Sequence, residues 1–176
     1  MTDNNNSNLN EQSIQEWNNI ECNKLKIWFE KIKARIRAHH SASYWNNIIN
    51  KVFTYTSLLL SVIISTISLN IEDSPVWLLP ALTITITLII VINIFFNFGK
   101  YSESHKNTKN GFSYLKQKIE TSLLQKNNPK VKFNNFIDDI SENFNILVKD
   151  SSRLPLYATN ILNDIKLLEA PDPFEN

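Results

Sequence analysis

The chain has 176 residues, 43% of them hydrophobic, and its 18 Lys and Arg nearly balance its 17 Asp and Glu, for a net charge of +1. This balance argues against nucleic acid as the main partner, because proteins that bind DNA or RNA carry a surplus of basic residues. A single cysteine, Cys22, excludes a disulfide framework and a thiolate metal cluster.

The N-terminal part divides into a tail and a helix. Residues 1–12 are polar and Asn-rich and have no signal-peptide character, so we expect a disordered tail. Over residues 13–51 apolar side chains recur at steps typical of one helix face: Ile14, Trp17, Leu25, Trp28, Ile32 and Ile36. The pattern predicts a long amphipathic helix that leads directly into the next segment.

Two apolar runs without charged residues follow, at 52–69 and 76–98. As helices they would span roughly 27 and 34 Å, enough to cross a hydrocarbon core of ~30 Å. The connection, residues 70–75, is long enough only for a tight turn. We therefore predict a transmembrane helical hairpin over 52–98. A buried hairpin in a soluble protein is the alternative, and it is disfavoured because core helices keep a polar face.

The charges around the hairpin predict its orientation. The turn carries Glu72 and Asp73 and no Lys or Arg, whereas both outer flanks are cationic: Arg35, Arg37, Lys51 and Lys100. The positive-inside rule then places both termini in the cytosol and the turn outside. We expect a multi-pass membrane protein with the two acids at the outer mouth and the cations at the inner flank.

Residues 99–168 show further helical stripes, and residues 169–176 form a second tail. One stripe consists of Phe112, Leu115, Ile119 and Leu123, and the next of Phe133, Phe136, Ile140, Phe144 and Leu147. Packing these stripes against the N-terminal helix would make a cytosolic helical bundle. Helices lying flat on lipid are the alternative, disfavoured because their polar faces are only mildly basic. The predicted fold class is an all-α membrane protein, a hairpin plus a bundle, that forms an oligomer.

Small polar residues recur inside both predicted spans: Ser57, Ser61, Ser65, Thr83, Thr87, Asn93 and Asn97. They could serve close packing between helices, or line a water-filled path formed by several copies. An unpaired amide in lipid costs several kcal/mol, so the two asparagines favour assembly with further copies. Because two helices cannot enclose a channel, conduction would require a homo-oligomer.

Three histidines, His39, His40 and His105, fall near the inner membrane surface. A pH or metal sensor is conceivable there, but no acid stands at the helical spacing from His39 or His40 that a metal site would use. We expect structural hydrogen bonding, with no metal and no cofactor. Phosphate-binding, dinucleotide, nucleophile-elbow and zincin motifs are absent from the sequence, so we expect no enzyme and no catalytic residue.

Three stretches carry a family resemblance. They are the basic helix KARIRAHHSASYW at 33–45, His105 followed by GFSYLKQKIETSLL at 111–124, and SSRLP at 151–155. With the hairpin between them, they resemble the SLATT family, a two-transmembrane-helix effector domain of bacterial conflict systems with a variant form in large DNA viruses.

The resemblance implies a membrane effector in antiviral defence. Members are thought to oligomerise and permeabilise the inner membrane when a linked sensor detects infection. The expected function is therefore a homo-oligomeric ion channel or pore, whose partners are the lipid bilayer, further copies of the chain and a separate sensor protein. The alternative is a non-conducting membrane scaffold or a viral membrane structural protein.

Overall fold

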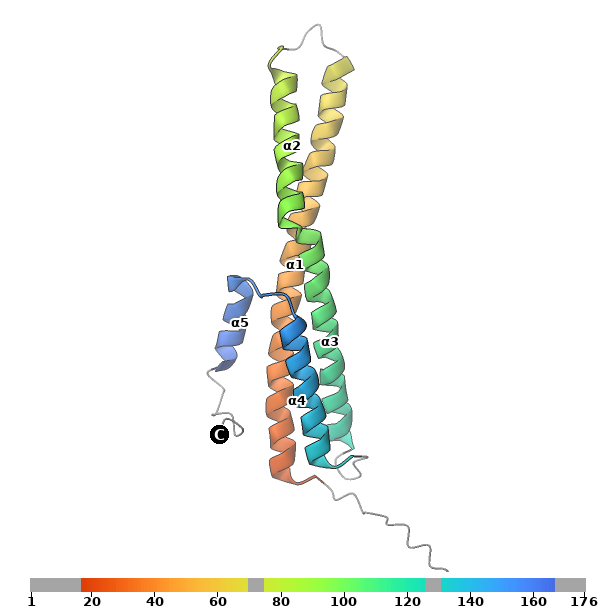
Figure 1. Ribbon diagram of the computed structural model, residues 1–176, viewed down its shortest axis with the longest axis vertical. Coiled ribbons are helices and arrows are strands. Elements are labelled where there is room, and N and C mark those ends of the chain that lie inside the picture. The colour runs from red at the N-terminus through yellow and green to blue at the C-terminus, as the bar shows by residue number, and fades with distance from the viewer. Residues whose placement is uncertain (1–16, 70–74, 126–130, 167–176) are drawn as a thin grey trace, which may run out of the picture.

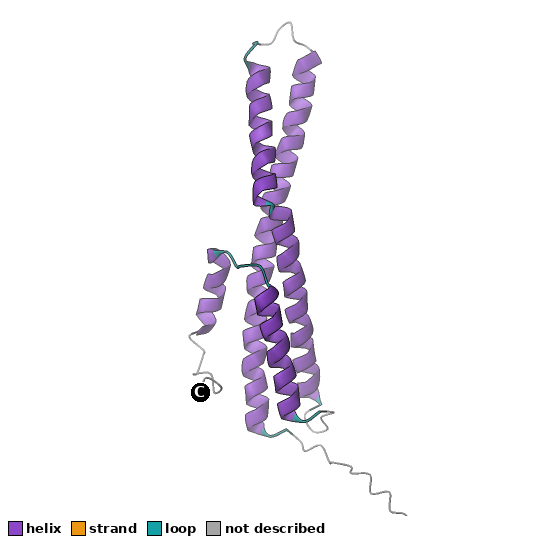
Figure 2. Cartoon of the chain, in the orientation of Figure 1, coloured by secondary structure: helices purple, strands orange, loops and turns teal. Residues whose placement is uncertain are grey.

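A computed structural model describes residues 17–69, 75–125 and 131–166, with side chains as far as residue 162 in the last range. Within these ranges the chain is entirely helical and contains no strand (Figure 2). The elements are α1 (Asn19–Leu69), α2 (Leu78–Phe96), α3 (Phe98–Leu124), α4 (Phe133–Asp150) and α5 (Leu156–Lys166). The all-α class predicted from the sequence is confirmed.

Helix α1 is a single helix of 51 residues that runs the length of the molecule (Figure 1). It begins with a capping box: the N–H of Glu21 donates to Asn18 Oδ1 at 2.9 Å, and the N–H of Asn18 donates to Glu21 Oε2 at 2.8 Å. The helix therefore starts at Asn19, later than residue 13. Residues 13–16 lie outside the described residues.

The upper third of α1, residues 52–69, and α2 form the hairpin. Both helices are long and apolar enough to cross a membrane, and no side chain of α2 is buried. The two helices lie closest near the bundle and stand apart toward the turn (Figure 1). The partly buried positions recur every three or four residues: Phe53, Ser57, Leu60, Ile64 and Ile67 on α1, and Leu82, Ile86, Ile89 and Asn93 on α2. These positions define the seam between the two helices.

The ends of α2 differ from the predicted span 76–98. Its first residue is Leu78, whose N–H donates to the carbonyl of Pro75 at 2.9 Å. Its last residue is Phe96, because Asn97 adopts a left-handed conformation with φ 47°. Asparagine tolerates this conformation better than most residues. Helix α3 begins immediately afterwards, so α2 and α3 together run back alongside α1 (Figure 1).

Below the hairpin, the apolar stripes of α1, α3 and α4 pack into one core. Its buried members are Trp17, Cys22, Leu25, Ile32, Phe112, Leu115, Ile119, Phe133, Phe136, Ile137 and Ile140. The predicted apolar stripes thus pack against one another, which favours a bundle over helices lying flat on lipid. Helix α5 packs on α1 and buries Ala158 (Figure 1). We call the part of the molecule formed by residues 19–51 of α1 with α3, α4 and α5 the bundle.

Candidate functional site

The small hydroxyl residues of the hairpin lie on two different faces. Ser57 is partly buried in the seam between α1 and α2. The remaining predicted hydroxyl residues are exposed on the outside of the hairpin: Ser61, Ser65, Thr83 and Thr87. A single chain therefore does not bring these four together, and they are available to lipid, to water or to another copy.

Each hydroxyl of this outer set that donates a described bond does so to its own helix. Ser65 Oγ donates to the carbonyl of Ser61 at 2.9 Å, Thr83 Oγ1 to that of Leu79 at 2.8 Å, and Thr87 Oγ1 to that of Thr83 at 2.7 Å. Such bonds to a carbonyl one turn earlier satisfy the donor without a neighbouring helix. A partner helix is therefore not needed to satisfy these donors, although each oxygen keeps lone pairs that can still accept a bond.

The two predicted asparagines have different surroundings. Asn93 lies in the seam, and its Oδ1 is buried with no hydrogen-bond partner among the described residues. Leaving such a buried acceptor unpaired costs about 1–3 kcal/mol. Asn97 is exposed, and its backbone rather than its amide has the structural role, since it forms the left-handed break between α2 and α3.

Charged residues predicted at the two mouths are only partly placed by the structure. Glu72 and Asp73 lie outside the described residues. Arg37, Lys51 and Lys100 are exposed. Arg35 is partly buried, and burial lowers the pKa of its guanidinium from the usual value.

Beneath the hairpin, α1 and α3 are joined by a reciprocal pair of serine bonds. Ser43 Oγ donates to the carbonyl of Ser102, and Ser102 Oγ donates to the carbonyl of Ser43, both at 2.9 Å. Two turns higher along α1, Asn50 lies beside Gly99, where an added Cβ would sit 3.5 Å from its Nδ2. The backbones of the two helices therefore approach closely at the junction between bundle and hairpin.

A histidine pair lies one turn below the serines. His39 Nδ1 and His105 Nδ1 are 3.1 Å apart, and the two side chains are 0% and 1% exposed. The ring of Phe112 stacks on His39 at a centroid distance of 5.8 Å. His40, which the sequence grouped with them, is exposed.

Burial sets the protonation of this pair. Burial lowers the pKa of His39 to about 4, with smaller contributions from the charges of His105 and Arg35, and burial also lowers the pKa of His105. Both imidazoles are therefore neutral at neutral pH, and one Nδ1–H donates to the other Nδ1.

The pairing of these two histidines was not predicted from the sequence, although the helical period places each of them on a buried face. His39 continues the helix face of Ile32 and Ile36, and His105 precedes Phe112 by two turns on the buried face of α3. A metal site is not indicated, because no group of three or more His, Cys, Asp or Glu side chains gathers among the described residues.

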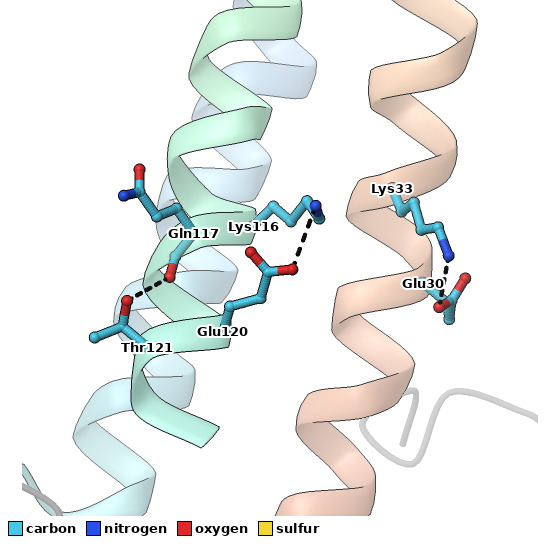
Figure 3. Close-up of polar contacts among 6 residues, drawn as sticks. All are labelled: Glu30, Lys33, Lys116, Gln117, Glu120 and Thr121. Atoms are coloured by element: carbon cyan, nitrogen blue, oxygen red, sulfur yellow. Dashed lines mark hydrogen bonds and ion pairs between the residues drawn. The ribbon is translucent and has the colours of Figure 1, made fainter. Parts of the chain in front are cut away.

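Other ionic contacts in the bundle are structural. Figure 3 shows Lys116 with Glu120 on α3 and Lys33 with Glu30 on α1, each pair at 3.3 Å and spaced by one helical turn. A third pair, Lys118 with Asp139, joins α3 to α4 at 2.5 Å. Partly exposed pairs of this kind contribute about 0.2–1 kcal/mol each, so they support the helices without forming a binding site.

No family model, no curated protein and no solved structure matches this chain. The structure itself provides two helices able to cross a membrane, joined to a packed helical bundle. Any function assigned to the chain therefore depends on the chemistry of these two parts.

Proposed function

We propose that this chain is a two-pass membrane protein that assembles into a homo-oligomeric ion channel or pore, as its resemblance to the SLATT family implies. In this proposal the bundle and both termini lie in the cytosol and the turn lies outside. The cationic flanks support that orientation, since Lys51 and Lys100 stand where the helices leave the hairpin.

The observation that carries the proposal is that no side chain of α2 is buried within one chain. An isolated hairpin leaves the whole outer surface of α2 to lipid, including Thr83 and Thr87. Small side chains let helices of neighbouring copies approach closely, so this surface suits packing between copies. Several copies arranged around an axis would also enclose the path that two helices alone cannot.

The outer hydroxyl residues would then border the path. Because the O–H groups of Ser65, Thr83 and Thr87 already donate to the helix backbone, their oxygens present lone pairs to the surroundings. Oxygen lone pairs can accept bonds from water and can stabilise a passing cation. The same backbone bonds also let the residues face lipid, which is why a non-conducting scaffold or a viral membrane structural protein stays the second candidate.

Ion flux into liposomes containing the purified full-length protein, measured together with its mass in detergent, tests the proposal. We expect an oligomer that conducts, and lower conductance for Thr83→Val with Thr87→Val. Thr85→Val is the matched control, because Thr85 is also exposed and bonds its own helix but points to another face of α2. An oligomer that never conducts supports the scaffold, and a monomer excludes both candidates.

A further inference from the structure

The histidine pair joins two helices inside the bundle, about three turns below the junction with the hairpin. His39 and His105 are 66 positions apart in the sequence, yet their Nδ1 atoms lie 3.1 Å apart. Ser43 and Ser102, one turn higher, exchange hydrogen bonds between the same helices. Two polar contacts, one turn apart, therefore join α1 to α3.

The surroundings of His39 Nε2 indicate which of the two Nδ1 atoms carries the shared hydrogen. This atom is buried and has no partner among the described residues. A buried N–H without an acceptor is rarer in proteins than an acceptor without a donor. His39 therefore carries its hydrogen on Nδ1 and donates it to Nδ1 of His105, an assignment based on the hydrogen-bond network.

We propose that His39 and His105 together form one proton-binding site that acts as an acid-sensitive latch between α1 and α3. The pair keeps an N–H···N bond when it is neutral and when it carries one extra proton. A second proton leaves a hydrogen on both Nδ1 atoms and two positive charges facing each other across 3.1 Å, so the contact must open. The proposal does not depend on ion conduction.

The surroundings make the second proton costly. Arg35, one turn below His39 on α1, adds a positive charge that disfavours protonation. Arg37 and His40 on α1 and Glu103, Lys106 and Lys109 on α3 lie within four positions of one of the two histidines. The neighbouring elements add Asp150, which lies at the end of α4 beside Ser104 and Thr108, Arg153, which follows the Ser152 that bonds Ser104, and Tyr157 on α5. No ion pair joins either imidazole to a carboxylate within the described ranges. An added charge would thus have no compensating partner in the bundle.

The sign of the pH dependence follows from the direction of the shifts. The folded pKa of His39 is lowered from 6.5 to about 4, so the unfolded chain binds more protons between these two values. The contribution of the pair to stability is fully present above pH 6.5. It is lost as the pH falls from 6.5 toward 4, and the loss levels off below that.

Thermal melting of the full-length protein in an uncharged detergent, followed by circular dichroism from pH 7.5 to 4, tests the latch. We expect Tm to fall by about 5–10 °C between pH 6.5 and 4 for the unmodified protein and for the control His40→Gln. The double variant His39→Leu with His105→Leu removes both partners, so no polar group is left unpaired. In this variant the decrease in Tm between pH 6.5 and 4 should be at most half as large. An unchanged acid profile in this double variant would overturn the proposal.

A second measurement covers the case in which the double variant does not fold. Histidine ring signals of the unmodified protein can be followed by NMR during an acid titration, with His40 assigned from His40→Gln. We expect the rings of His39 and His105 to titrate together in two steps, one of them near pH 4. Independent single-step titrations of these two rings near pH 6.5 would show that His39 and His105 do not share a proton.

Discussion

The backbone carbonyl of Asn93 accepts a hydrogen bond from the N–H of Asn97 at 2.9 Å, and this bond closes α2 immediately before the chain turns left-handed. Asn97 thus ends one helix and precedes the next, while the Asn93 side chain lies in the seam of the hairpin. Two residues of the same type, one turn apart, have unrelated roles, and they require separate tests.

Replacing Asn97 tests the left-handed break. Asn97→Gly should leave stability nearly unchanged, because glycine adopts a φ of 47° without strain. Asn97→Val should cost at least about 1–2 kcal/mol, since a branched side chain clashes in this conformation. Thermal melting in detergent measures both variants. Equal Tm values for the Gly and Val variants would contradict the assigned backbone role.

Asn93→Leu tests whether the amide acts between copies. If Asn93 bonds an adjacent subunit, the variant should loosen the assembly by about 0.6–2 kcal/mol for each lost bond. If the amide serves only the seam, removing its unpaired carbonyl should stabilise the hairpin and keep the oligomer mass. Mass in detergent at several protein concentrations distinguishes these outcomes, and Ile94→Leu, at the exposed neighbouring position, is the matched control.

Gly111 lies where an added methyl group would meet the side chain of Leu147. A Cβ at this position would lie 2.6 Å from Cδ2 of Leu147 on α4, so Gly111→Ala must push α3 and α4 apart or displace that leucine. Overpacking of this kind typically costs about 1–3 kcal/mol. The control is Gly99→Ala, where the nearest atom is at an ordinary 3.5 Å. If Gly111→Ala melts at the same temperature as Gly99→Ala, Leu147 moves aside at little cost and the packing of α3 on α4 does not require a glycine at position 111.

The proposed orientation can be tested by labelling in a Cys22→Ala background, because the native Cys22 is buried and reports poorly on either side. Ser74→Cys, in the turn, should react with a membrane-impermeant maleimide on intact cells. Asn110→Cys, exposed on α3, should react only after the cells are opened. The opposite pattern would invert the topology.

The ion selectivity of the proposed channel tests whether Glu72 and Asp73 line its outer mouth. A ring of Glu72 and Asp73 from several copies would concentrate cations, so the channel should prefer cations to anions. Glu72→Gln with Asp73→Asn should then shift the reversal potential in a salt gradient toward that of anions. If the variant still conducts and its selectivity is unchanged, the pore exists but the two acids do not determine its selectivity.

Much of the architecture could be predicted from the sequence because it depends on local properties. The length of an apolar run sets whether a helix can cross a membrane, and the 3.6-residue period identifies the buried stripe of each helix. Both hairpin helices and the core positions Leu25, Ile32, Phe112 and Ile140 follow from these rules.

The tertiary structure decided how each helix is rotated and which residues meet. A stripe of serines shows that one face differs from the others, but only packing against α2 places Ser57 in the seam and Ser65 outside. The contact between His39 and His105 spans 66 positions, and no local pattern encodes a contact over that distance. Such pairings arise because α1 and α3 pack in the register that buries the most apolar surface, and this register brings distant residues into contact.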